Sequence, residues 1–473
     1  MGISTAAIDH GRMPGPRSVP FVGWQVRGLR MLHDPLSYLT RVYRRYGAIS
    51  SWTPRHPRHV FAFGPEPNRQ LFGSPECFCV DAFRELPVPP GSAMSRLTNG
   101  LLKLNGETHR NHRRLMQPAF HSRQVESYLA AIVELAQAEL DSWRPGDSRA
   151  IGRDLSRLTL RVAMKTIFDL ESAEGVDGLH GIIVRLLALG GSPATLLLPL
   201  DLPGTAYRRL LRTAEEMDRA LRAMIDAKRR DPTGGDVLTA LITARDEQGA
   251  RLTDDELISE AYTAFCHESS AASLTWTLFL LDQHPEVEAD LRDELSAALG
   301  GAAPTADDLA RLPLLDRVLK ESLRLFPPAA FGLRYTARPC ALGPYELPEG
   351  ATIFFSQYVT HRIPDAFPQP LRFQPSRWET FRPGVYEYIP FGAGPHHCLG
   401  RSFATLEMKI VLAMLLQRYR LRIEPRSRVD PQVRISLVPR QALRMRVAPP
   451  VNGRDRIPVH GSVHESVDLS QRR

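Results

Sequence analysis

The feature that most constrains the fold is the stretch Tyr388 to Gly400, which reads Tyr-Ile-Pro-Phe-Gly-Ala-Gly-Pro-His-His-Cys-Leu-Gly. Glycines and prolines crowd into it, so a tight, preset turn is expected rather than a helix or a regular strand. Apolar residues recur at helical spacing directly afterwards, at Phe403, Leu406, Ile410 and Met414. A single cysteine, Cys398, therefore lies between a preset turn and the start of a helix.

The surroundings of Cys398 favour a metal-binding thiolate. Backbone N–H groups of the turn and of the helix N-terminus can point at its sulfur, and with the helix dipole they favour thiolate over thiol. A lone thiolate in a glycine-lined turn, with His396 two residues before it, suits axial ligation of a heme iron. The alternative is a small core cysteine, which is the commoner role of a free cysteine taken alone.

The spacing Phe391-x-x-Gly394-x-His396-x-Cys398-x-Gly400 resembles the heme-binding signature of the cytochrome P-450 monooxygenases. Arg is usual two residues before the cysteine in that family, and His is a common bacterial variant. The resemblance implies heme b, bound without covalent attachment, with Cys398 as the iron ligand. The cofactor-binding residues that it implies in this loop are Phe391, Gly392, His396, Cys398 and Gly400.

Two other segments match the family's contacts to the heme propionates. His109 and Arg113 lie four apart on one helix face, and two cationic donors there can hold a carboxylate. A solvated basic face is the alternative, and only the family position favours binding. Arg334 matches a second propionate clamp, against the alternative of an ordinary strand arginine. The remaining basic residues of the first segment are assigned to the surface: Arg110, His112 and Arg114.

A long buried helix is expected in the middle of the chain. A capping residue followed by acids, Thr253 to Glu256, predicts its start, and the pattern, apolar on most sides, predicts one helix through to Leu280. Glu268 is costly there without a partner or a task. The resemblance implies that Glu268 and Ser269 relay protons during oxygen activation. It places Ala264, Phe265 and Cys266 in the substrate pocket.

This helix departs from the family pattern. Phe265 and Cys266 stand where Ala/Gly-Gly is usual, and their bulk is expected to stiffen that turn. Ser269 lacks the methyl group that restricts a threonine rotamer. A working but less tightly held proton relay is predicted, so Cys266→Gly should change the fraction of NADPH electrons that reach product.

A structural network is implied by Glu321-x-x-Arg324, which lies on one face of a helix ending before Phe326-Pro327. In the family this pair is buried with a later arginine, here Arg377, and locks the loop that leads to the cysteine. Its expected role is structural. An apolar stretch, Leu196 to Pro203, falls where the family has a mobile lid, and a core-packing loop is the equal alternative.

Composition and patterning indicate one domain. No linker, repeat or low-complexity block divides the chain, and a hydrophobic content of 43% allows a large core. The expected fold is mainly α with small β-sheets, and the resemblance implies a single cytochrome P-450 fold with heme between the long distal helix and the helix after the cysteine loop. Residues 1–20 are expected to form a loose arm, 21–450 the heme domain and 451–473 a disordered tail.

Charge and cysteine usage limit the partners and the compartment. The net charge of +8 is scattered, which disfavours nucleic-acid binding and favours a basic face for an acidic protein. The five cysteines are irregularly spaced, which indicates a reducing compartment. No apolar run reaches the roughly 18 residues of a membrane span, and no signal-peptide core is present. A cytoplasmic protein is expected.

The function implied by the resemblance is a heme-thiolate monooxygenase that inserts one oxygen atom from O2 into a hydrophobic small molecule. A terpenoid, a fatty acid and a polyketide all fit. Because the chain has no flavin domain or dinucleotide fingerprint, electrons are expected from a ferredoxin or flavodoxin with its NAD(P)H-dependent reductase. Oxidative cyclisation or coupling by the same heme chemistry, and a non-catalytic heme-binding protein, are the alternatives.

Overall fold

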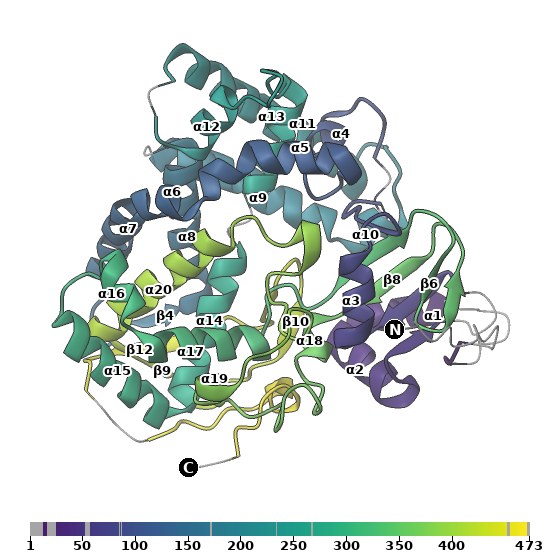
Figure 1. Ribbon diagram of the computed structural model, residues 1–473. Coiled ribbons are helices and arrows are strands. Elements are labelled where there is room, and N and C mark those ends of the chain that lie inside the picture. Colours follow the sequence, from purple (N-terminus) through teal and green to yellow (C-terminus); the bar gives the residue numbers. More distant parts are fainter. Residues whose placement is uncertain are drawn as a thin grey trace. The chain divides into compact units, whose positions relative to one another are not determined.

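The computed structural model describes residues 13–16, 25–52, 57–84, 86, 88–170, 173–232, 234–265, 268–451 and 455–470. The chain divides into two compact units, each assembled from separate stretches of sequence. The first comprises residues 1–81, 323–398 and 465–473, and the second comprises 82–322 and 399–464. The predicted class, mainly α with small β-sheets, is confirmed (Figure 1).

The first unit is organised on a five-stranded sheet in the order β1-β2-β8-β5-β3. Strands β1 and β2 form an antiparallel hairpin, and β8 pairs with β2 in parallel. The elements of this unit are α1 (Gln25–His33), α2 (Pro35–Tyr46), β1 (Ile49–Ser51), β2 (His59–Ala62), α3 (Pro65–Gly73), β3 (Phe78–Cys79), β5 (Gly332–Thr336), β6 (Cys340–Leu342), β7 (Tyr345–Leu347), β8 (Thr352–Phe355), α18 (Gln357–Thr360), α19 (Arg377–Thr380) and the 3-10 turn η2 (Gly394–His396).

The core of the first unit includes the segment that leads to Cys398. Ile389 and Ala393 are buried in one apolar cluster with Phe72 of α3 and Phe355 of β8. Burying such side chains removes apolar area from water at roughly 25 cal/mol per Å². The cysteine loop is therefore fastened to the sheet by its own apolar residues.

The second unit is mostly helical. Its elements are α4 (Ala93–Leu97), α5 (Gly106–Met116), η1 (Gln117–Phe120), α6 (Ser122–Ser127), α7 (Leu129–Asp141), β4 (Ser148–Ala150), α8 (Ile151–Phe168), α9 (Ala173–Gly190), α10 (Pro193–Leu197), α11 (Ala206–Arg230), α12 (Val237–Thr243), α13 (Asp254–Ala264), α14 (Glu268–Gln283), α15 (Pro285–Leu299), α16 (Ala306–Ala310), α20 (Arg401–Arg418), β9 (Arg420–Ile423), β10 (Pro431–Val433), β11 (Leu437–Pro439) and β12 (Arg444–Ala448). Helix α17 (Pro313–Leu325) and the 3-10 turn η3 (Ser462–Glu465) continue from this unit into the first.

Helix α14 is the centre of the second unit. It packs against α8 and α20, and α20 packs in turn against α7 (Figure 1). The side chains of α14 from Ser270 to Gln283 are all buried, as an all-round apolar pattern predicts. The helix predicted after the cysteine loop is α20, which is therefore confirmed.

The prediction of one continuous distal helix is wrong at its middle. Helix α13 begins at the predicted capping box, in which Thr253 and Glu256 bond each other reciprocally, but it ends at Ala264. Phe265 has ψ of 16° and donates its N–H to the carbonyl of Tyr262, a three-residue turn rather than a helical bond. Helix α14 begins at Glu268, and Cys266 and His267 lie outside the described residues.

The predicted disorder of the tail is wrong for residues 455–470. Val463 and Val467 are fully buried. The carboxylate of Asp430 accepts bonds from the backbone N–H and hydroxyl of Ser462, at 2.7 and 3.0 Å. Polar composition favoured disorder, but Val459, Val463, Val467 and Leu469 of this segment are buried.

Part of the predicted loose arm is also held in place. Met13 is buried, and the carbonyl of Pro14 accepts the N–H of Ser51 at 2.9 Å. The rest of residues 1–20 lies outside the described residues. Among the helices that the structure describes, none combines the length and the apolarity that a membrane crossing requires.

Candidate functional site

The backbone of the cysteine loop is set by its glycines. Gly392 and Gly394 have φ of 70° and 67°, the left-handed region that other residues rarely adopt. At Gly394 an added Cβ would lie 2.3 Å from the carbonyl oxygen of Phe72, so only glycine fits against α3 there. The N–H of Cys398 donates to the carbonyl of Phe391 at 2.8 Å, which closes the loop, and the Cys398 residue is exposed. The loop thus holds an exposed cysteine on a fixed backbone.

A buried histidine joins this loop to the end of α17. The Nε2 of His361 accepts the N–H of Ile389 at 2.9 Å, so its proton is on Nδ1, which donates to the carbonyl of Arg324 at 3.2 Å. Burial, together with the charge of Arg324, lowers the pKa of His361 to about 3. The ring is therefore neutral. Sequence reasoning missed His361 because no motif contains it.

The arginines of the predicted structural network hold backbone carbonyls. The Arg324 guanidinium is fully buried and donates to the carbonyls of His361, Pro370 and Arg372, at 2.9, 2.7 and 3.0 Å. Arg377 donates to the carbonyls of Pro368 and Gln369, at 2.8 and 3.3 Å. Glu321, one turn before Arg324 on α17, is also fully buried. Both arginines thus fasten the segment of residues 361–372, and their pairing with Glu321 stays a prediction.

Arg334 is a buried cation. Its guanidinium carbon lies 5.1 Å from the ring centres of both Phe72 and Phe355, and Nη1 donates to the carbonyl of Leu333 at 2.9 Å. Burial lowers the pKa of Arg334 to about 10, so the group keeps its charge at neutral pH. Within the described ranges no carboxylate forms an ion pair with it. A buried charge of this kind is costly unless an anion reaches it.

Heme fits these residues of the first unit. Cys398 offers one exposed thiol, and Arg334 offers a buried cation suited to a propionate carboxylate. No three His, Cys, Asp or Glu side chains converge as metal ligands within the described part of the chain. His396 lies in η2, two residues before the cysteine, and is half-buried.

In the second unit, His109 and Arg113 lie on α5 as predicted, but His109 is not a cation. Its side chain is buried, and burial lowers its pKa to about 4, with Arg113 and His112 adding to the effect. His109 is therefore a neutral N–H donor, and Arg113 carries the positive charge of this pair. The expectation of two cationic donors is wrong chiefly because His109 is buried, and the neighbouring positive charges add to the effect.

His112, assigned to the surface from sequence, is buried. Its two ring nitrogens lie 2.8 Å from a Glu260 oxygen and 3.2 Å from a Glu256 oxygen, both on α13. Arg114 is exposed, as predicted, in an ion pair with Glu247. In sequence a basic cluster indicates a solvated face. Only the packing of α5 shows which of its basic residues are buried and which are exposed.

The acid and the alcohol predicted for proton transfer begin α14. Glu268 is half-buried, and burial raises its pKa while the charge of Arg434 opposes the rise. Such a carboxyl holds a proton closer to neutral pH than an exposed one does, as acid–base chemistry requires. Ser269 is half-buried, and its carbonyl accepts the hydroxyl of Ser273 at 2.8 Å.

A second acid adjoins this helix start and was missed. Glu407 of α20 is buried and hydrogen-bonds Ser270, and burial raises its pKa to about 8. Its carboxyl is therefore protonated at neutral pH. The only signal in the sequence was a single acid within the apolar run of α20. Such an acid is indistinguishable from an ordinary polar position of a helix.

The residues predicted for the substrate pocket differ in exposure. Ala264 is half-buried, whereas Phe265 is buried with its ring stacked on Phe168 at 5.7 Å between centres. Cys266 lies outside the described residues. In the predicted lid the exposed fractions of Leu197, Leu198, Leu200 and Leu202 are 52% to 63%, which contradicts a core-packing loop.

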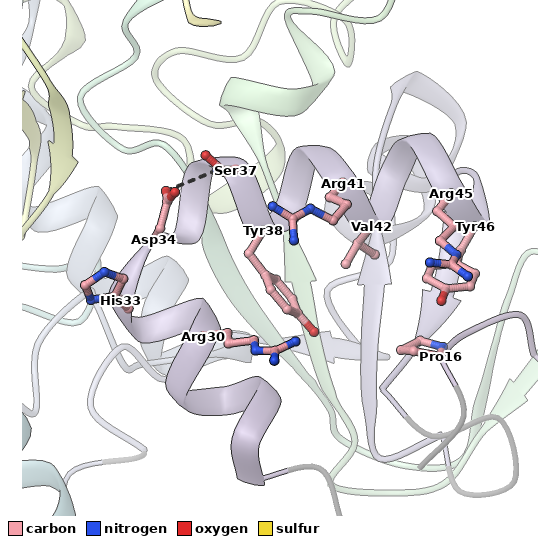
Figure 2. A pocket seen from close by; sticks show the side chains of 10 residues that line it. All are labelled: Pro16, Arg30, His33, Asp34, Ser37, Tyr38, Arg41, Val42, Arg45 and Tyr46. Atoms are coloured by element: carbon pink, nitrogen blue, oxygen red, sulfur yellow. Dashed lines mark hydrogen bonds between the residues drawn. The ribbon is translucent and has the colours of Figure 1, made fainter. Parts of the chain in front are cut away.

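A cavity of about 590 Å³ lies elsewhere, between α1 and α2 of the first unit (Figure 2). Its lining includes three arginines, Arg30, Arg41 and Arg45, and the Tyr38 hydroxyl points into it beside Arg30. Asp34, the one acid in the lining, caps α2 by accepting the N–H of Ser37 at 3.2 Å. None of the predicted site residues lines this cavity.

Comparisons with known proteins bear on this arrangement. The Cytochrome P450 family matches residues 13–445. Cyclooctat-9-en-7-ol 5-monooxygenase of Streptomyces melanosporofaciens is 33% identical over 430 residues, which are 87% of this chain and 89% of the relative. Pentalenene oxygenase of Streptomyces avermitilis is 33% identical over 454 residues, 91% of this chain and 96% of the relative.

Solved structures have the same fold. A retinoic acid-bound cyanobacterial CYP120A1 is similar with a TM-score of 0.79 and 27% identity, over 93% of this chain and 99% of that one. The heme domain of cytochrome P450DA is similar with a TM-score of 0.81 and 25% identity, over 93% of this chain and 98% of that one.

Proposed function

The chain belongs to the cytochrome P450 family, and from that premise we propose that it hydroxylates or epoxidises a terpenoid. As a family member it is an oxidoreductase that binds heme b and incorporates oxygen from O2. The terpenoid substrate is supported by the activities for which its relatives are named, on cyclooctat-9-en-7-ol and on pentalenene. The observation that carries the proposal is the exposed Cys398 thiol on a glycine-set backbone.

The proposed site residues of the first unit hold the heme. Cys398 would ligate the iron through Sγ, and His396, Phe391 and Gly392 shape the loop around it. Gly400, in the second unit, is the N-cap of α20 directly after this loop. Arg334 binds a propionate, because its buried charge lacks an anion among the described residues. Heme bound in this way supplies the redox chemistry of O2 cleavage.

Two residues of the second unit bind a heme propionate, and two others deliver protons. Arg113 supplies charge and His109 a neutral N–H to a propionate. The Glu268 carboxyl holds a proton more readily than an exposed acid and passes it by way of the Ser269 hydroxyl. Ala264 and Phe265 contribute an apolar surface for the substrate, and the assignment of Cys266 to the pocket rests on its sequence position alone. The exposed leucines of residues 197–202 cover the entrance.

A separate electron donor is part of the proposal. The sequence has no flavin domain and no dinucleotide fingerprint. A ferredoxin or flavodoxin, reduced by an NAD(P)H-dependent reductase, delivers the electrons in the cytoplasm. The net charge of +8 supports an acidic partner, because opposite charges speed encounter.

The first test is spectroscopic. Purified holoprotein is reduced with dithionite and exposed to carbon monoxide, and the red-shifted band of a thiolate-ligated heme is expected. Cys398→Ser should abolish that band. Cys340→Ser, which changes a half-buried thiol on β6, should keep it. Heme-loaded wild-type protein without the band would overturn the assignment of Cys398.

The second test concerns the reaction. Cyclic terpenoid hydrocarbons and alcohols should shift the Soret band towards the high-spin form, and fatty acids should not. Turnover under ¹⁸O₂ with a ferredoxin and its reductase should place one labelled atom in the product. A dehydrogenated or cyclised product without label would establish the coupling alternative. No product with any electron donor would favour a heme-binding protein without catalysis.

A further inference from the structure

A buried imidazole is held between two carboxylates in the second unit. His112 of α5 is 5% exposed, with Nδ1 2.8 Å from Glu260 Oε1 and Nε2 3.2 Å from Glu256 Oε1. Carboxylate oxygens accept hydrogen bonds, so both ring nitrogens must donate, and only the doubly protonated ring does so. Burial alone would lower the pKa of His112, and the two carboxylates outweigh it, so the pKa is raised.

The Glu260 carboxylate holds a second segment as well. It is fully buried, and its Oε2 accepts the N–H of Leu101 at 3.3 Å. At Gly100 an added Cβ would lie 2.7 Å from Thr263 Oγ1, 2.9 Å from the Ser259 carbonyl and 3.1 Å from Glu260 Oε2. The chain before α5 therefore packs directly on α13, where any larger residue would displace it.

The outer carboxylate belongs to the start of α13. Glu256 Oε2 accepts the backbone N–H and the hydroxyl of Thr253, both at 2.8 Å, while Oε1 faces His112. The same side chain closes the capping box and meets the imidazole. Thus α5, the segment of residues 100–101 and the first turns of α13 share one charged cluster, His112–Glu260–Glu256.

The cluster restrains the helix that carries two predicted cofactor ligands. His112 directly precedes Arg113 and lies three residues after His109, so its side chain extends from α5 within one helical turn of both. A bond at each ring nitrogen opposes both rotation and translation of α5 against α13. We propose that His112 is a positioning residue, whose clamp by Glu260 and Glu256 orients His109 and Arg113 towards a heme propionate. This inference rests on the propionate role given to α5 under the proposed function.

The direct test replaces the imidazole with a neutral amide. His112→Gln retains one hydrogen bond but loses the charge and the second contact. We expect its holoprotein to release heme to excess apomyoglobin at least about threefold faster, at a temperature where circular dichroism equals that of wild type. The propionate bending bands of the resonance Raman spectrum should shift or broaden. A merely structural role would lower the melting temperature and leave both of these measurements unchanged.

Two variants on the same helix separate the possible failures. Arg114→Gln removes an exposed ion pair with Glu247 but no part of the cluster, and its heme release should equal that of wild type. Arg113→Gln tests the propionate role itself and should release heme faster. If Arg113→Gln is faster and His112→Gln equals wild type, the positioning role is wrong and the proposed function stands. If Arg113→Gln also equals wild type, the propionate role of α5 fails.

A gentler change decides the matter if His112→Gln does not fold. The Glu256 side chain is about one-third exposed, and Glu256→Gln keeps its amide oxygen for the capping box. The buried contact between His112 and Glu260 stays in place. Faster heme release with the same Raman shift, smaller in size, would support the clamp. Wild-type heme release in Glu256→Gln would overturn it.

Discussion

Two buried histidines, one in each unit, have opposite charge states. His361 is fully buried, and its pKa falls to about 3, whereas His112 is 5% exposed and its pKa rises. Burial disfavours the charged form of both rings. His361 meets backbone groups and the charges of Arg324 and Arg362, while His112 meets two carboxylates. Burial alone makes a ring neutral, as at His361, and His112 stays charged because its two carboxylates outweigh the same burial cost.

The two units also differ in how they position their proposed site residues. Around Cys398 the backbone does the positioning, through left-handed glycines, a neutral histidine and arginines that bind carbonyls. Around α5 and α14 charged or protonated side chains do it, through His112 with its carboxylates and through Glu407 with Ser270. Substitutions that change backbone freedom should thus be costliest in the first unit, and changes of pH should act with opposite signs at the two histidines.

The largest effect is expected at Gly394. Gly394→Ala combines φ of 67° with a Cβ 2.3 Å from the Phe72 carbonyl, and we expect it to lower the free energy of unfolding by about 3 kcal/mol. Gly73→Ala on the adjoining α3 is the control, since its Cβ would meet nothing closer than 3.8 Å. Urea unfolding followed by circular dichroism measures both. Equal stability of the two variants would show that backbone geometry does not govern this loop.

The next effect is expected at His361. His361→Leu leaves the N–H of Ile389 and one bond of the Arg324 carbonyl without a partner, which should cost about 2 kcal/mol at pH 7. Wild type should also lose stability as the pH falls below about 6.5, since the unfolded chain then binds a proton that the folded ring refuses. His361→Leu should lack that part of the acid dependence. An unchanged slope between pH 6.5 and 4.5 would contradict a neutral buried ring.

A smaller effect of opposite sign is expected at Glu407. Its pKa of about 8 in the folded protein exceeds the ordinary value of about 4.3. As the pH rises between these values, the unfolded chain releases a proton that the folded chain retains, so folding becomes less favourable. Glu407→Gln should therefore be more stable than wild type at pH 7.5 and about equal to it at pH 4.5. A destabilised variant at both pH values would mean that Glu407 is ionised in the fold.

The smallest effect is expected at His112. Its contribution to the free energy of unfolding should fall as the pH rises, and this gives the most direct comparison with His361. The pKa of His112 is raised in the fold by Glu260 and Glu256, although burial opposes them. The stabilisation is complete below the unfolded pKa of about 6.5 and is lost as the pH rises through the folded value. The stability difference between wild type and His112→Gln should shrink from pH 6 to pH 9. A difference that grows over that range would place His112 with His361 as a neutral ring.

Local rules accounted for much of this protein. The cysteine turn, the helix after it, the β1–β2 hairpin and the capping box at Thr253 all depend on residues close together in sequence. Glycine conformations, helical periodicity and caps act within a few residues. The fold class, and the proposal that Cys398 is the iron ligand, followed from them and from the resemblance that the motif carries.

Contacts between distant segments decided the rest. Phe265 leaves the helical path while its ring stacks on Phe168, and residues 455–470 are ordered because Val463 and Val467 are buried. The charge of His112 depends on Glu260, 148 residues away in sequence. Sequence by itself determined which backbone shapes and which thiol the chain offers. Only the tertiary structure decided which polar groups are buried and which partners they have, because desolvation and pairing arise where remote segments come together.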